Sequence, residues 1–72
     1  MEQTKTQPDP LLLDIADVGR MTGLSRRTIF RLMAREEFPR PKQIPTGARR
    51  WTRASIVRWT ERLQDAEVAT HG

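Results

Sequence analysis

The junction between residues 23 and 25 constrains the fold most, because it ends one helix and starts another with a single residue between them. Gly23 can adopt the left-handed conformation that ends a helix. Ser25 is a favoured N-cap for the next helix, because its hydroxyl can accept from a free first-turn amide. The sequence therefore predicts one helix over 15–22 and a second over about 26–36, joined by a tight turn.

Apolar residues recur along both predicted helices at the spacing of a single buried face. They are Ile15, Val18 and Met21 in the first helix, and Ile29, Leu32 and Met33 in the second. Leu24 is expected to fill the turn as an apolar plug. Asp14 is expected to cap the first helix, with Asp17 at the capping-box position. Two short helices joined in this way form a helix-turn-helix unit.

The second half of the chain predicts a small β-hairpin followed by a third helix. Pro39 and Pro41 end the second helix, because proline pushes the preceding residue out of helical geometry. The hairpin is expected to consist of an extended segment over 42–45, a turn over 46–48 and a returning segment over 49–51. Its inward-facing side chains are expected to be Ile44 and Trp51.

Thr52 is expected to cap the third helix. The buried stripe of that helix is expected to be Ile56, Trp59, Leu63 and Ala66, and Trp51 and Trp59 are both expected to belong to the core. The apolar run 11–13 is either a brief strand or a strap over the core.

These elements predict one mainly α domain with a small β-hairpin, a winged helix-turn-helix of three helices plus a wing, over residues 11–66. The length of 72 residues allows no more than one small domain. Residues 1–10 are expected to be a disordered tail and residues 67–72 a frayed tail.

The sequence offers nothing that suggests an enzyme. Cysteine is absent and His71 is the one histidine, so no metal or cofactor is expected. No nucleophile–base set or phosphate-binding loop is present, and no small-molecule ligand is expected. Without a long apolar run or a signal peptide, the protein is expected in the cytoplasm, at the nucleoid and away from the membrane.

Positive charge is concentrated in the middle of the chain. Ten of the thirteen basic residues lie between Arg20 and Arg53, where Glu36 and Glu37 are the only acidic residues. The net charge of +4 for the whole chain therefore understates how much more positive this middle part is than the flanks. Most of these cations are arginines, whose planar guanidinium suits phosphates and base edges. A merely solvated basic surface is the alternative, but such segregation opposes compact folding through self-repulsion.

The candidate DNA-binding residues lie on the second helix, mostly on its outward face, and around the hairpin. On the helix they are Ser25, Arg26, Arg27, Thr28, Phe30, Arg31 and Arg35; around the hairpin they are Lys42, Thr46, Gly47, Arg49, Arg50 and Arg53. Arg27 and Arg31 could each contact guanine in the major groove. Phe30 either contacts sugar or a base methyl, or is a half-buried aromatic beside the core. The hairpin is either a wing on the minor groove or phosphate edge, or purely structural.

The order of several motifs resembles the AlpA family of small regulators from phages and mobile elements. The motifs are Thr22-Gly23-Leu24-Ser25-Arg26, Thr28-Ile29-Phe30-Arg31-Leu32, Phe38-Pro39-Arg40-Pro41, Arg50-Trp51 and Ile56-Val57-Arg58-Trp59. The resemblance covers about residues 11–63. Phe30 stands where the family often has tyrosine, and Arg27 where it often has a small polar residue.

The resemblance implies a winged helix-turn-helix, related to excisionases and MerR proteins, that binds double-stranded DNA. The expected role is that of an excisionase (a recombination directionality factor) or a transcriptional regulator. Possible partners besides DNA are an integrase and adjacent copies of the protein, which is expected to be monomeric when free. The alternative is a protein–protein adaptor or anti-repressor whose basic face meets an acidic partner.

Overall fold

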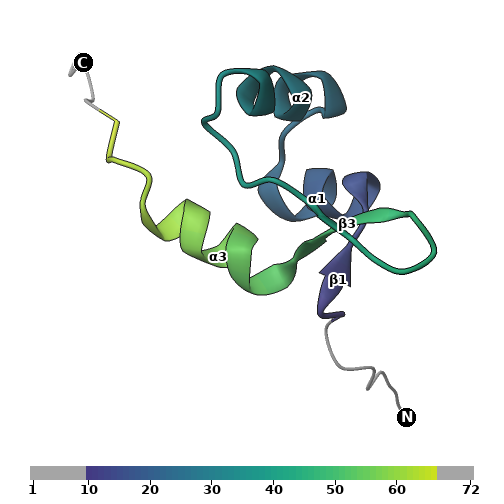
Figure 1. Cartoon of the computed structure of the whole chain (residues 1–72). Coiled ribbons are helices and arrows are strands. Elements are labelled where there is room, and N and C mark those ends of the chain that lie inside the picture. Colours follow the sequence, from purple (N-terminus) through teal and green to yellow (C-terminus); the bar gives the residue numbers. More distant parts are fainter. Residues whose placement is uncertain (1–9, 67–72) are drawn as a thin grey trace, which may run out of the picture.

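The computed structural model describes residues 10–66, in which three helices surround a small sheet (Figure 1). The elements in chain order are β1 (Leu12–Leu13), α1 (Ile15–Thr22), α2 (Arg26–Ala34), β2 (Lys42–Gln43), β3 (Arg49–Thr52) and α3 (Arg53–Glu61). This arrangement confirms the predicted winged helix-turn-helix with three helices and a hairpin. The two expected tails lie outside the described residues, apart from Pro10. Within residues 10–66, each helix is too short and too polar to cross a bilayer.

The sheet has the strand order β1-β3-β2, and both pairings are antiparallel. Leu13 lies opposite Trp51, so the apolar run 11–13 provides a short strand rather than a loose strap. The backbone amide of Arg53 extends this pairing by donating to the carbonyl of Leu11 over 2.8 Å. Because β3 is central and runs directly into α3, it ties the hairpin to the rest of the domain.

The predicted signals at both ends of α1 are confirmed. Asp14 and Asp17 form a capping box, in which each carboxylate accepts from the other residue's backbone amide, over 2.8 Å at Asp14 and 3.2 Å at Asp17. The Asp17 amide holds the pKa of the Asp14 carboxyl below its usual range. Gly23 ends α1 in the left-handed conformation, with φ 79°.

The second helix ends two residues earlier than predicted, at Ala34 instead of Glu36. Glu36 adopts a left-handed conformation with φ 59°, which a helix cannot contain. The Glu36 amide donates to the carbonyl of Met33 over 2.9 Å, and the Glu37 amide to that of Leu32 over 2.8 Å. These are the two hydrogen bonds of a Schellman motif, which satisfies the last carbonyls of the helix.

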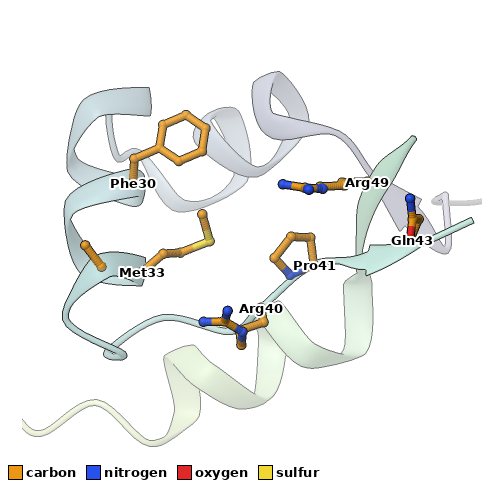
Figure 2. A pocket seen from close by; sticks show the side chains of 7 residues that line it. Phe30, Met33, Arg40, Pro41, Gln43 and Arg49 are labelled. Carbon is orange, nitrogen blue, oxygen red and sulfur yellow. The ribbon is translucent and has the colours of Figure 1, made fainter. Parts of the chain in front are cut away.

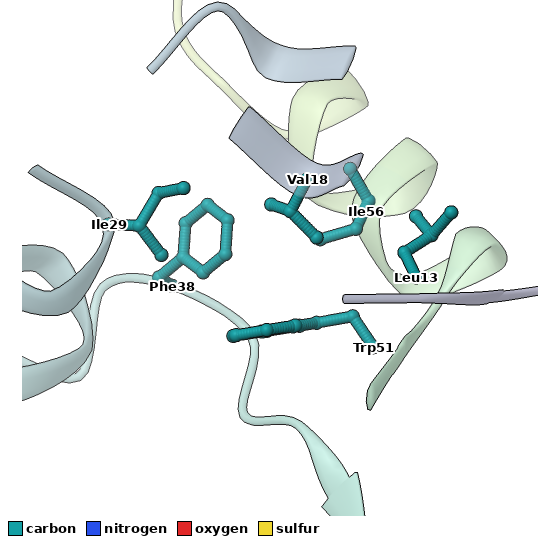
Figure 3. Packing of buried hydrophobic residues seen from close by; sticks show 6 residues of the cluster. All are labelled: Leu13, Val18, Ile29, Phe38, Trp51 and Ile56. Atoms are coloured by element: carbon teal, nitrogen blue, oxygen red, sulfur yellow. The ribbon is translucent and has the colours of Figure 1, made fainter. Parts of the chain in front are cut away.

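Six buried apolar side chains, drawn from five elements and the segment after α2, form the core (Figure 3). They are Leu13, Val18, Ile29, Phe38, Trp51 and Ile56. Trp59 packs against this cluster, as do Ile15, Leu24, Leu32 and Met33. The expected core roles of both tryptophans and of Leu24 are therefore confirmed. Ile44 is half-buried.

Phe38 has no regular secondary structure around it, yet it joins the two tryptophans. Its ring meets that of Trp59 edge-on at a centroid distance of 4.6 Å and that of Trp51 at 6.4 Å. The indole N–H of Trp51 donates to the carbonyl of Pro39 over 2.7 Å, and that of Trp59 to the carbonyl of Glu37 over 3.0 Å. The segment after α2 is thus held on both sides of Phe38.

Three residues expected in the core are exposed instead. Met21 is 48% exposed, whereas Leu24, just beyond the end of α1, packs against the core. Leu63 is 54% exposed and Ala66 is also exposed, because α3 ends at Glu61 after leading away from the other elements (Figure 1). The expected stripe therefore stops at Trp59.

The substitution Phe38→Ala is expected to lower the free energy of unfolding by about 3–5 kcal/mol, through the lost burial and the cavity left behind. That is comparable to the whole stability of a small domain, which is on the order of 5 kcal/mol. Leu63→Ala is the matched control and should change stability by less than about 0.5 kcal/mol. Urea denaturation followed by circular dichroism measures both. Similar losses in the two variants would contradict the described core.

Candidate nucleic-acid interface

The outward face of α2 carries Arg27 and Arg31, four residues apart and both exposed. The opposite face is fixed, because Ile29 is completely buried. Neither arginine forms an ion pair with any residue in the range 10–66. Two guanidinium groups are therefore presented side by side on a helix whose rotation about its axis is set by the core.

Ser25 begins α2 as predicted. Its Oγ accepts from the Thr28 amide over 3.1 Å and donates to the Thr28 hydroxyl oxygen over 2.9 Å. The cap satisfies one of the free amides of the first turn and leaves the start of the helix exposed. This exposed start could approach a phosphate group.

Phe30 is exposed rather than part of the core, with 44% of its surface accessible. The guanidinium of Arg26 lies 5.7 Å from the centre of its ring, within the range of a cation–π contact. Arg26 and Phe30 thus form one composite surface beside the outward arginines. An exposed aromatic here is available for sugar or base contacts.

Arg35 differs from the other arginines of this helix because it has an acidic neighbour. Its Nε lies 3.4 Å from a carboxylate oxygen of Glu37, and both side chains are largely exposed. Such an exposed pair contributes little to stability. It does offset part of the positive charge at the end of α2.

The hairpin divides its basic residues between two faces. Lys42 lies opposite Arg50, and Gln43 opposite Arg49. Because successive side chains of a strand alternate, Arg49 and Gln43 lie on the side facing α2, and Lys42 and Arg50 on the other side. Figure 2 shows Arg49 extending from the hairpin towards α2.

Arg50 is half-buried and lies near the start of α1. Its charge contributes to the lowered pKa of Asp14, after the larger effect of the Asp17 amide. The side chain also donates to the Arg49 carbonyl over 2.8 Å. Arg50 is thus partly engaged within the protein, unlike the exposed Lys42 and Arg49.

The hairpin tip is narrow, exposed and held by short-range hydrogen bonds. Gly47 has φ 96°, and a Cβ placed there would meet no atom within 4 Å, so its conformation is what favours glycine. The Gly47 amide donates to Ile44 over 2.8 Å, and the Ala48 amide to the Thr46 hydroxyl over 3.3 Å. These contacts shape a tip that could approach a groove or a phosphate edge.

Arg53 is the predicted site residue that the structure separates from the rest. It begins α3, and its Nε donates to the carbonyl of Pro10 over 3.2 Å, beside Met21. Arg40, by contrast, was given no individual role by the sequence, although it lies exposed in the same groove as Phe30 and Arg49. Its position depends on the fold of the segment after α2, where the prolines predict the end of the helix but not the contacts that follow.

One comparison with known proteins gives a family match. Residues 12–64 match the family described as "Prophage CP4-57 regulatory protein (AlpA)". No match was found among curated proteins or among solved structures. In residues 10–66, no three His, Cys, Asp or Glu side chains are grouped to hold a metal ion.

The substitution Ser25→Ala is expected to lower the free energy of unfolding by about 1 kcal/mol, because the Thr28 amide loses its acceptor. Ser25→Asn is the matched control and should retain most of the stability, since asparagine caps about as well as serine. Thermal melts of the three proteins measure the difference. Equal destabilisation by both substitutions would show that Ser25 acts through something other than its cap.

Proposed function

This chain belongs to the AlpA family of phage regulatory, DNA-binding proteins, and we propose that it binds specific sites on double-stranded DNA. In this proposal α2 enters the major groove, and the hairpin between β2 and β3 contacts the adjacent minor groove or its phosphates. The family is a regulatory one rather than a family of enzymes.

The observation that carries the proposal is the outward pair Arg27 and Arg31 on a helix anchored by Ile29. An arginine can donate two hydrogen bonds to a guanine edge, which makes it the commonest specific contact in the major groove. Thr28 lies on the same helix and could reach a phosphate or a thymine methyl. Helix α2 is therefore the proposed source of sequence preference.

The hairpin is proposed to supply contacts that position the protein without reading sequence. Lys42 and Arg49 are exposed, and the tip at Thr46 and Gly47 has no bulky side chain to hinder approach. Such contacts to phosphate oxygens fix register and orientation on the duplex. Arg53 lies apart from this surface and is proposed to contact DNA only at its periphery.

The biological role is proposed to be that of an excisionase, a promoter regulator or both. Several copies bound at nearby sites could bend DNA and so serve recombination or transcription. The free protein is proposed to be a monomer, because α3 has only nine residues and provides no long coiled coil. Adjacent copies on DNA, and an integrase bound beside them, are the proposed partners.

Affinity for DNA is expected to depend steeply on salt. If about five phosphates are neutralised, the logarithm of affinity should fall with the logarithm of salt concentration with a slope of about −4 to −5. Fluorescence anisotropy on a random duplex, and on a duplex selected from a random-sequence library, measures this slope. A slope shallower than about −2 would argue against the basic face as the binding surface and favour the adaptor alternative.

The two basic elements are expected to contribute differently. Arg31→Ala should cost about 1–3 kcal/mol on the selected duplex and much less on random DNA, because it removes a base contact. Arg49→Ala should weaken binding to both duplexes about equally, because it removes a phosphate contact. Competition between the two duplexes measures both effects. If Arg31→Ala lost equal affinity for both duplexes, α2 could not be the element that recognises the DNA sequence.

A further inference from the structure

An open groove lies between α2 and the hairpin, with a volume of about 550 Å³. Phe30 and Met33 form its α2 side, Arg40 and Pro41 come from the connecting segment, and Gln43 and Arg49 close the hairpin side (Figure 2). The groove therefore separates the two elements proposed to enter neighbouring grooves of the duplex.

The charge of this groove is positive and is not neutralised within the described chain. Arg40 and Arg49 are both exposed, and neither forms an ion pair with a residue of the range 10–66. None of the residues that line the groove is acidic. Glu36 borders a smaller adjoining hollow with Arg40, but the two do not pair. The groove thus suits a negatively charged ligand.

Apart from Gln43, the remaining lining residues are apolar, which adds a second requirement for a ligand. Phe30 is exposed along the groove, and Met33 and Pro41 lie beside it. A ligand that fits therefore combines anionic groups with carbon-rich ones. The sugar–phosphate backbone of DNA does this, since each phosphate is followed by a deoxyribose.

The backbone on either side of Arg40 is held by neighbouring contacts. The Pro39 carbonyl accepts from the indole of Trp51 over 2.7 Å, and Pro41 fixes the backbone on the other side. Phe38 anchors the same segment in the core. The backbone that carries Arg40 is therefore fixed relative to both α2 and the sheet.

We propose that this groove holds one sugar–phosphate strand of the duplex, the strand that separates the major groove under α2 from the minor groove under the hairpin. Arg40 and Arg49 contact successive phosphates, while Phe30 and Pro41 pack against deoxyribose. This inference rests on the proposed function and deepens it, because it assigns a phosphate contact to Arg40.

The test compares Arg40→Ala with Arg58→Ala in the full chain. Both substitutions remove one exposed arginine, but Arg58 lies on α3 beside Glu36 and Glu37, outside the groove. Arg40→Ala should weaken binding to selected and random duplexes by the same factor, about tenfold. Its salt slope should become shallower by about 0.9, whereas Arg58→Ala should keep the wild-type slope. Arg40→Lys should keep the slope, because it keeps the charge.

Duplexes with a single neutral methylphosphonate locate the contact. One modified position should weaken the wild-type protein but have little further effect on Arg40→Ala, because the contact is already lost. The groove assignment would be overturned if Arg40→Ala bound DNA with the affinity and salt slope of the wild type. It would also be overturned if Arg58→Ala changed both quantities as much as Arg40→Ala does. Either result would leave DNA binding itself in place. Failure of the wild-type protein to bind either duplex would overturn the proposed function as well.

Discussion

The placement of every element around the site depends on how two tryptophans hold the segment that follows α2. This segment forms no helix or strand, so its backbone carbonyls must find donors elsewhere. The indoles of Trp51 and Trp59 supply them, at the carbonyls of Pro39 and Glu37. Phe38 lies between these two bonds and packs edge-on against both rings. One irregular stretch thereby connects α2 with the sheet and with α3.

The basic surface is assembled from three parts of the chain, and this connection sets their spacing. Arg27 and Arg31 come from α2, Arg49 from the hairpin and Arg40 from the segment between them. No carboxylate lies within their groove, whereas Asp17 on α1 is paired with Arg20. Because the fold fixes the backbone that carries these arginines, the ordering needed on binding is limited to their exposed side chains. The domain is thus a frame that fixes the spacing of its basic backbone positions.

Local signals predicted most of the secondary structure, since each depends on residues three or four positions apart. Gly23 and the caps at Ser25 and Thr52 are of this kind, and all three have the predicted role. Most of the errors concern tertiary structure, and one concerns the end of α2. Phe38 was not expected in the core and Leu63 was, because burial there depends on where the sheet and α3 lie. The left-handed Glu36 had no signal, since glutamate rarely adopts that conformation.

The same distinction applies to the site. The outward face of α2 follows from helical periodicity, and its exposed arginines are where the pattern puts them. Arg40 and the groove beside it follow from contacts that no short window of sequence contains.

The hairpin tip adds a consequence for the divergence of such proteins. Residues Pro45, Thr46 and Gly47 are exposed, whereas β3 is held by β1 and by the buried Trp51. Changes in the length or charge of the tip are therefore expected to leave folding intact, so related proteins can vary the proposed positioning contacts of the hairpin while α2 keeps its position.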